Sequence, residues 1–428
     1  MRKVRARRTR AIIIVGILIT STPALADHVV VKRHVTLRVA PDRASAAIEY
    51  PEPRTELALL DDGRRTRGYF HVERADGREG WIYQTFVERR EGDPASAVAS
   101  LAPAPVMSVH YVDVDQGAAA VLEFPCAVVM VDAGGRTDAD RLHLLDYLHR
   151  IFARRPELGG RISSIFITHT HVDHNRNLRA VVEAFPVGGY VDNGFETGSG
   201  SPGARWIRSW LDTAGTARPH DFVRQAQVEA AGGGGLTDAV VDPVSCEGVD
   251  PRISVLAGGR EQNPGWPDGK FENGNNQSLV IRVDFGKASF LFTGDMEDTA
   301  LETLVDRWAG TSMLDVDVWS VGHHGSHNGT TVPLLAAMTP KVAVISMGRE
   351  QIQLQWTAWA YGHPRRDVVE AVAAGVAQGR APVTVRVADK VRLFSDYQLA
   401  KAVYATGWDG DVTVRADTNG NVEVLTGQ

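Results

Sequence analysis

The chain has 428 residues, 43% of them hydrophobic, which is enough apolar content for two or three domains with packed cores. It carries 46 basic and 52 acidic residues, and six of the basic ones but none of the acidic ones lie in the first 26 positions. Removal of that segment would leave 40 basic against 52 acidic residues, a net charge of −12. So acidic a surface does not favour the nucleic-acid backbone unless a local basic patch or a metal site attracts it.

The N-terminus has the pattern of a secretory signal peptide. A basic segment, Met1–Arg10, precedes the ten-residue apolar run Ala11–Thr20, and a small-x-small site follows at Ala24-Leu25-Ala26. An apolar run of ten residues is too short for a membrane span, which needs roughly 20. We expect residues 1–26 to be cleaved and the protein to be secreted or periplasmic, with no stable membrane span left.

The chain has two cysteines, Cys126 and Cys246, and neither has the spacing of a metal ligand. A disulfide is one outcome in an oxidising compartment, and two separate buried thiols are the other. The sequence gives no distance between them, so both alternatives stay open.

An Ala/Pro/Ser-rich stretch, residues 90–106, is typical of a linker and separates a small module, residues 27–89, from the rest. The module has short alternating segments between turn residues, as in a small β-barrel. Its segments Val35–Asp42, Gly68–Val72 and Asp76–Tyr83 resemble the bacterial Src-homology-3-like domain. That resemblance implies binding to peptidoglycan; a module that only packs or spaces is the alternative.

The large part, residues 107–428, alternates strand and helix patterns, which predicts an α/β layered fold. Residues 186–272 are rich in Gly, Asn, Asp and Pro, and we expect them to form loops around the site. The predicted strands are Val128–Val131, Ile162–Thr168, Ser278–Val283, Ala288–Thr293, Val316–Val321 and Val342–Ser346, and the predicted helices are Asp138–Phe152, Ala300–Trp308, Val332–Met338 and Arg366–Ala373.

The strongest chemical signal follows the predicted strand Ile162–Thr168, where His169, His171, Asp173 and His174 fall within six residues. Imidazole nitrogens and carboxylate oxygens together suit a divalent cation such as Zn²⁺. Alternation along an extended segment places His169 and His171 on one side, and the turn that follows brings Asp173 and His174 beside them. The pattern predicts a metal site at the end of a buried strand.

This motif resembles that of the metallo-β-lactamase superfamily, which implies a four-layer αβ/βα sandwich. Two further segments fit in order. Val131–Gly135 resembles the early motif whose aspartate, here Asp132, orients the metal loop, and Phe292–Asp295 resembles the later motif whose aspartate bridges two metals.

The resemblance extends to the hydrolase domain of ComEC-type competence proteins, over about residues 110–415. The matching segments are Val112–Gly117, Asn275–Val280, Val321–Ser326, Tyr361–Pro364 and Val403–Gly410.

The resemblance also implies roles for single residues. His169 and His171 would bind a first metal, and a second would be bound by Asp173 and His174, with Asp295 bridging and His363 completing the site. One of His323 and His324 is expected to be a ligand or to contact the scissile group. Asn276 and Ser326 are expected to contact substrate. The residues named for catalysis are Asp132, Asp173, His323 and His324.

One departure concerns the interval between the metal motifs, where many superfamily members have another ligand histidine. Here that interval contains only His220, whose surroundings do not resemble the motif, and Asn276 is expected to take the vacant position. Loss of an imidazole weakens a site or shifts its preference toward Mn²⁺. Zn²⁺ is the metal we expect first, with Mn²⁺ as the alternative, as one or two ions.

We therefore predict a metal-dependent hydrolase that attacks a phosphodiester, or another small anionic substrate, with a metal-activated water. A hydrolase of β-lactams or other amides or esters is one alternative. A wall-binding protein with a vestigial hydrolase domain is another, although the intact metal motif counts against it.

Overall fold

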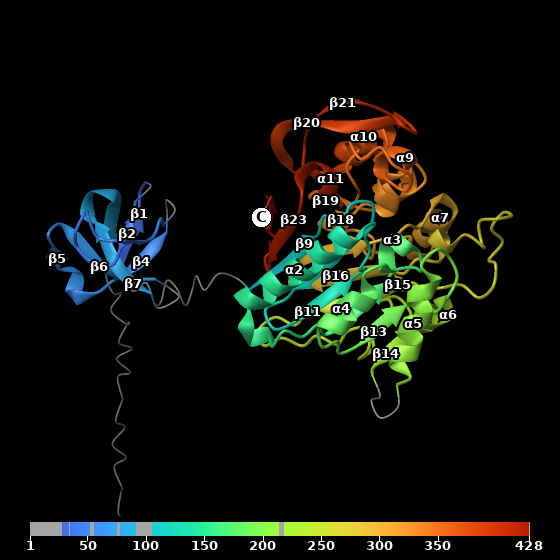
Figure 1. Ribbon diagram of the computed structural model, residues 1–428, viewed down its shortest axis with the longest axis horizontal. Helices are drawn as coiled ribbons and strands as arrows, with labels where there is room; N and C mark the ends of the chain where they lie inside the picture. Colours follow the sequence, from blue (N-terminus) through green and yellow to red (C-terminus); the bar gives the residue numbers. More distant parts are fainter. Residues whose placement is uncertain are drawn as a thin grey trace, which may run out of the picture. The chain divides into compact units, whose positions relative to one another are not determined.

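The computed structural model describes residues 28–33, 35–51, 55–74, 78–90, 105–213 and 218–427. The predicted signal peptide, most of the predicted linker, and Asp76 and Gly77 of the segment Asp76–Tyr83 lie outside these residues. The chain divides into two compact units, residues 1–103 and 104–428 (Figure 1).

The first unit is an antiparallel sheet in the order β3-β2-β7-β6-β4-β1-β8, with β5 paired to β6. Its core is a small apolar cluster that includes Val29, Leu37, Val72 and Ile82, all fully buried. The strands are β1 (His28–Val31), β2 (Leu37–Arg38), β3 (Ala47–Glu49), β4 (Glu56–Leu59), β5 (Arg65–Thr66), β6 (Tyr69–Glu73), β7 (Glu79–Tyr83) and β8 (Val87–Arg90).

The second unit contains two large mixed sheets and a hairpin. The first sheet has the order β14-β13-β12-β11-β10-β9-β23-β24, the second β15-β16-β17-β18-β19-β22, and β20 pairs with β21. The first-sheet strands are β9 (Val106–Tyr111), β10 (Ala120–Glu123), β11 (Val128–Val131), β12 (Ser164–Ile167), β13 (Tyr190–Asp192), β14 (His220–Phe222), β23 (Val412–Asp417) and β24 (Val422–Thr426). The others are β15 (Arg252–Ala257), β16 (Val280–Phe285), β17 (Ala288–Phe292), β18 (Val318–Ser320), β19 (Val342–Ile345), β20 (Gly379–Lys390), β21 (Leu393–Lys401) and β22 (Val403–Ala405).

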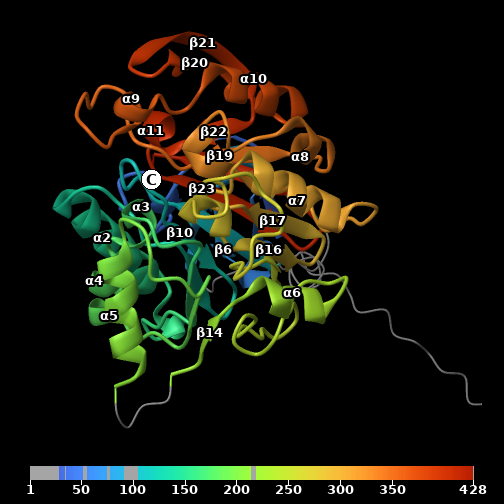
Figure 2. The same ribbon diagram turned by 90° about the vertical axis from the view of Figure 1, so that its right-hand side faces the viewer.

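Helices cover the outer faces of the two sheets. In Figure 2, α2, α4 and α5 lie on one side of the strands and α7 and α8 on the other, which gives the four layers. The main helices are α2 (Asp138–Arg154), α3 (Val172–Asn175), α4 (Leu178–Ala184), α5 (Ser201–Leu211), α6 (Gln225–Ala231), α7 (Asp298–Trp308), α8 (Val332–Ala336), α9 (Ala358–Tyr361), α10 (Arg366–Gly375) and α11 (Thr406–Asp409).

Strand β11 shows why the layers form. Its residues are apolar at every position, and successive side chains point to opposite faces of a sheet. Val129 and Val131 therefore pack in the core that includes both sheets, whereas Val128 and Met130 pack against α2 and α4. A strand that is buried on both faces belongs inside a layered α/β fold.

Helix α2 begins at a capping box in which Thr137 accepts from the backbone N–H of Asp140, while the Asp140 carboxylate accepts from the N–H of Thr137. The helix buries Leu144, Leu148 and Ile151 on one face, whereas Leu142, which the spacing also placed on that face, is 63% exposed.

The prediction of loops throughout residues 186–272 was wrong. The segment supplies three strands, β13, β14 and β15, and two helices, α5 and α6. Helix α5 begins with Ser201-Pro202-Gly203, a composition typical of loops. Proline fits the first turn of a helix, however, because its missing N–H has no partner there.

Cys126 and Cys246 form a disulfide across 120 residues, so the alternative of two separate thiols is excluded. Among the described residues, none of the helices has the length and apolar character needed to cross a bilayer.

Candidate metal centre

The predicted site residues converge where strands from both sheets end. The His169–His174 segment follows β12, Asp132 follows β11, Asp295 follows β17, and His323 and His324 follow β18. Open α/β sheets hold ligands at the carboxyl ends of their strands. A cavity of about 660 Å³ opens here, and five of these side chains line it: His171, Asp173, Asp295, His323 and His324.

Asp132 ties the metal loop to the strand before it. Its carboxylate accepts hydrogen bonds from the Thr168 backbone N–H at 2.7 Å and from the Thr168 hydroxyl at 2.9 Å. The other contact is with His174, whose Nδ1 lies 2.7 Å from Asp132 Oδ2. With Nδ1 engaged in this way, the Nε2 atom of His174 is the nitrogen directed toward the centre of the site.

Gly134 permits the close packing of two loops. A Cβ at this position would lie 1.6 Å from the carbonyl oxygen of Asp173. That carbonyl accepts a hydrogen bond from the backbone N–H of Ala118 at 2.9 Å. The glycine therefore lets the loop after β11 support the backbone on which Asp173 stands.

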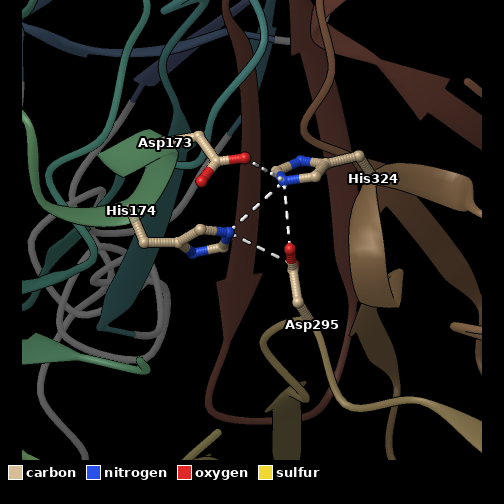
Figure 3. Close-up of side chains that lie close together, drawn as sticks. All are labelled: Asp173, His174, Asp295 and His324. Atoms are coloured by element: carbon tan, nitrogen blue, oxygen red, sulfur yellow. Dashed lines mark hydrogen bonds and ion pairs between the residues drawn. The ribbon is translucent and has the colours of Figure 1, made fainter. Parts of the chain in front are cut away.

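Four side chains form the centre of the site, shown in Figure 3: Asp173, His174, Asp295 and His324. One ligand atom from each lies within 4.8 Å of the others. His324 Nε2 is 3.3 Å from Asp295 and 3.4 Å from Asp173, and His174 Nε2 is 3.2 Å from Asp295. We call these four residues the donor cluster.

His169 and His171 lie beside the donor cluster. The Nε2 atom of His169 is 3.0 Å from Nδ1 of His171 and 3.9 Å from an oxygen of Asp295. His169 is fully buried, and His171 lines the cavity. Asp295 therefore stands between the predicted first and second pairs of ligands.

Electrostatics couple the members of the donor cluster. Burial alone would raise the pKa of Asp295, but the imidazoles of His174 and His324 outweigh it and hold that pKa well below its usual value. Burial would lower the pKa of His324, but the carboxylates of Asp295 and Asp173 raise it to about 10. Burial would also lower the pKa of His174, but the carboxylates of Asp295 and Asp132 raise it well above its usual value.

The residues present fit a divalent cation. The Nε2 atoms of His174 and His324 face each other at 3.3 Å, an arrangement in which two protonated rings would repel. Two carboxylates, Asp173 and Asp295, converge on the same point. A cation shared by neutral imidazoles and carboxylates satisfies all four groups, and nitrogen with oxygen is a donor set that Zn²⁺ and Mn²⁺ both accept.

His323 and His324 have left-handed backbone conformations, with φ of 50° and 53°. Such conformations cost a non-glycine residue about 1–3 kcal/mol and gather at functional sites. The two consecutive turns send the rings in different directions. The ring of His324 is held by its Nδ1, 2.6 Å from the carbonyl of Ser346, while that of His323 contacts Asn328 at 2.9 Å.

The structure thereby separates the two histidines that the sequence left open. His324 belongs to the donor cluster, whereas His323 Nε2 lies 4.0 Å from Asp295 and 3.3 Å from the side-chain nitrogen of Asn275. His363, predicted to complete the second site, lies outside the donor cluster. Its ring forms part of the cavity wall and stacks 6.1 Å from that of His324.

Of the two predicted substrate-binding residues, Ser326 lines the cavity and Asn276 does not. The side chain of Asn276 is used inside the fold, since its nitrogen donates to the Lys270 carbonyl and its oxygen accepts from the Glu297 N–H. Its neighbour Asn275 lines the cavity instead. His220 is exposed on β14 and is not among the residues around the cavity.

Sequence reasoning missed the remaining cavity wall. Three arginines line it, Arg136, Arg176 and Arg365, and so do Trp356, Tyr361 and Val391. Trp356 is 68% exposed, so its ring stands at the mouth. Tyr361 begins the matching segment Tyr361–Pro364, but no motif marks the other five residues, because they come from separate loops that only the fold brings together.

Residues 112–349, more than half of the chain, match the family model described as the metallo-beta-lactamase superfamily. The chain belongs to this superfamily. It is therefore a member of a metallo-hydrolase superfamily, and the four-layer fold agrees with that membership. The match begins at residue 112, so the Src-homology-3-like resemblance of residues 27–89 stays a prediction.

Several curated proteins are similar to parts of this superfamily member. Recombination protein 2 of Haemophilus influenzae is 43% identical over 89 residues, 21% of this chain and 10% of that protein. Competence protein ComA of Neisseria gonorrhoeae is 37% identical over 100 residues, 23% of this chain and 13% of that protein. The uncharacterized protein YcaI of Escherichia coli is 24% identical over 248 residues, 56% of this chain and 25% of that protein.

These relatives confirm the predicted resemblance to competence proteins, and the chain spans a quarter or less of their length.

Among solved structures, human tRNase Z, short form, has a TM-score of 0.28 at 16% identity, covering 56% of this chain and 91% of that one. A diphosphatase from the PhnP family has a TM-score of 0.30 at 11% identity, covering 56% and 85%.

Proposed function

We propose that the protein is an extracytoplasmic, metal-dependent phosphodiesterase. The observation that carries this is the composition of the cavity, which is lined by three members of the donor cluster, Asp173, Asp295 and His324, and by three arginines, Arg136, Arg176 and Arg365. Guanidinium groups suit phosphate because they donate planar, paired hydrogen bonds to its oxygens. The similarity to competence and recombination proteins also supports a phosphodiester substrate.

The arginines differ in how freely they can meet an anion. Arg136 is tied to Asp115 at 2.5 Å, whereas Arg176 has only a looser pairing, with Asp138 at 3.6 Å. The Nε atom of Arg365 is buried without a hydrogen-bond partner and lies 3.6 Å from Asp367, while Nη2 donates to the Asp389 carbonyl at 3.2 Å, which leaves Nη1 for an anion. Arg176 and Arg365 are therefore the two expected to bind substrate oxygens.

The donor cluster would hold one divalent cation, and His169 with His171 and Asp295 would hold a second. When bound, such cations supply Lewis-acid chemistry that polarises a phosphoryl oxygen and activates water. The chain itself orients these groups, because Asp132 fixes His174 and the Ser346 carbonyl fixes His324. Asn275 and Ser326 add polar contacts at the cavity wall.

The apolar part of the cavity indicates what else the substrate carries. Trp356, Tyr361 and Val391 are exposed at 68%, 40% and 52%, and all three line the cavity. They would hold an aromatic or apolar substituent next to the phosphate. The net acidic surface favours a small diester over a long polyanion.

The location outside the cytoplasm rests on two features. The first 26 residues have the signal-peptide pattern, and Cys126 and Cys246 form a disulfide, which persists in oxidising compartments. Cell fractionation, with the intact chain traced by antibody, tests this location.

For the first unit we propose binding to peptidoglycan. A groove of about 670 Å³ on this unit is lined by Arg38, Arg43, Arg67, Tyr69 and Tyr83, among others. The arginines suit the carboxylates of wall peptides, and the tyrosine rings suit sugar faces. Co-sedimentation of the full chain with purified wall should weaken in an Arg43→Glu variant.

Turnover of bis-p-nitrophenyl phosphate and of nitrocefin, each with Zn²⁺ or Mn²⁺, tests the proposed reaction. Metal-dependent cleavage of the diester, with little of nitrocefin, supports the phosphodiesterase. The opposite preference would assign the site to β-lactams, and cleavage of neither with metal bound would argue against both substrates.

A further inference from the structure

Gln116 lies in the segment Val112–Gly117, which neither the predicted metal sites nor the proposed reaction explains. Its side chain is buried, with 3% exposed, and it connects two distant parts of the chain. The side-chain oxygen accepts a hydrogen bond from the backbone N–H of Gly348 at 3.3 Å. The side-chain nitrogen lies 3.2 Å from Nδ1 of His363, 247 residues away in the sequence.

These two contacts determine which way the Gln116 amide faces. A backbone N–H can only donate, so the group that faces Gly348 must be the amide oxygen. The NH₂ group consequently faces His363, and because it can only donate, Nδ1 of His363 must accept. A neutral imidazole carries one proton, which then resides on Nε2.

Two aromatic rings lie nearly parallel to that of His363. The ring of Tyr361 stacks on it at 5.5 Å with an interplanar angle of 19°, and that of His324 at 6.1 Å with 23°. His363 lines the cavity, and with Nδ1 engaged by Gln116, Nε2 is the nitrogen that remains for the cavity. His363 is also absent from the donor cluster.

We propose that Gln116 is a positioning residue that holds His363 as the Nε2–H tautomer, so that His363 donates a hydrogen bond to an anionic substrate oxygen instead of binding a metal. A nitrogen that carries a proton has no lone pair for a metal, and an N–H donor on a residue of the cavity wall is the group an anionic oxygen requires. The identity of the substrate rests on the proposed function, whereas the tautomer does not.

The test uses the full chain with ¹⁵N-labelled histidine and zinc bound. Long-range ¹H–¹⁵N spectra report the tautomer of each imidazole, and a His363→Ala variant identifies the signal. We expect His363 as the Nε2–H tautomer in the wild type. A Gln116→Glu variant should reverse it, because a carboxylate accepts from Nδ1–H and still accepts from Gly348. A wild-type His363 protonated on Nδ1 would overturn the proposal.

Metal content gives a second, independent readout. His363→Ala should retain the zinc stoichiometry of the wild type, whereas His324→Ala should lose zinc. Equal loss in both variants would make His363 a ligand and overturn the proposal.

Diester turnover should fall roughly 10- to 100-fold in Gln116→Glu with zinc content unchanged. Gln225→Leu is the matched control, since Gln225 is a buried glutamine that also accepts from a glycine N–H, that of Gly258 at 3.1 Å, away from the cavity. If the protein cleaves no diester, the tautomer and the zinc content still decide the proposal.

Discussion

The Nε2 atoms of His174 and His324 lie 3.3 Å apart, although 150 residues separate them in the chain. His174 follows a strand of one sheet and His324 a strand of the other, so their meeting depends on the packing of both sheets. A cation at this point would join the two halves of the fold. Metal binding and folding stability should therefore be linked.

Zinc should raise the melting temperature of the protein, and His324→Ala should abolish most of that increase. A ligand that binds only the folded state at 100 times its Kd stabilises it by about 2.7 kcal/mol. Differential scanning calorimetry with and without EDTA measures the effect. His220→Ala, which changes an exposed histidine on β14, serves as the control and should respond like the wild type. An equal zinc response in the His324 variant would contradict the donor cluster.

Gly134→Ala should lower zinc affinity by at least tenfold, although Gly134 contributes no donor atom. An added Cβ would lie 1.6 Å from the Asp173 carbonyl oxygen, so one of the two loops must move. Isothermal titration calorimetry measures the affinity. Gly233→Ala is the control, because a Cβ there meets no atom within 4 Å. Unchanged zinc binding in the Gly134 variant would show that the metal loop tolerates displacement.

Glu123→Gln should destabilise the protein most at neutral pH. Burial alone would raise the pKa of Glu123, but His110, Arg154 and Arg155 outweigh it and lower the pKa to about 2. The pKa of this carboxylate is lower in the folded protein than in the unfolded chain, where it is near 4.5. Its charge therefore stabilises the folded state fully above pH 4.5, and this contribution is lost as the pH falls toward 2.

We therefore expect the variant to lose about 3 kcal/mol of unfolding free energy at pH 7, and less than half of that at pH 3. Urea denaturation at the two pH values gives both numbers. Glu183→Gln changes an exposed pair with Arg179 and should cost little at either pH. A loss of equal size at both values would place the effect in packing instead of charge.

Trp356→Ala should raise the KM for bis-p-nitrophenyl phosphate several-fold, with a smaller effect on methyl p-nitrophenyl phosphate. The Trp356 ring lines the cavity, 6.3 Å from that of Tyr361, and its large exposed surface is available to an aromatic substituent. Steady-state kinetics on both diesters give the comparison. Leu142→Ala removes an exposed apolar side chain on α2 outside the cavity and should leave both values unchanged. Equal effects on the two diesters would mean that Trp356 does not select the substituent.

The sequence predicted the parts of the molecule that depend on local patterns. Strand β11 has the predicted bounds, and α2 begins at the predicted residue, because buried strands and amphipathic helices show their periodicity directly. The His169–His174 segment could be recognised for the same reason, since its donors lie within six residues.

The features that the sequence did not predict depend on distant contacts. Helix α5 was hidden by a glycine-rich start, and the pairing of Cys126 with Cys246 spans 120 residues. His323 and His324 are adjacent in sequence, and only their left-handed backbone sends one ring into the donor cluster. The contact of Gln116 with His363 joins two motifs that had no visible relation.

The central claim is that the donor cluster binds metal and that this metal is required for cleavage of phosphodiesters. The most direct test measures metal content and bis-p-nitrophenyl phosphate turnover of the chain from Asp27 onward, beside a His171→Ala/Asp173→Ala double variant. We predict one or two divalent ions per wild-type chain and metal-dependent turnover, both lost in the variant. A wild-type chain that binds no metal, or a variant that cleaves the diester as fast as the wild type, would contradict the claim.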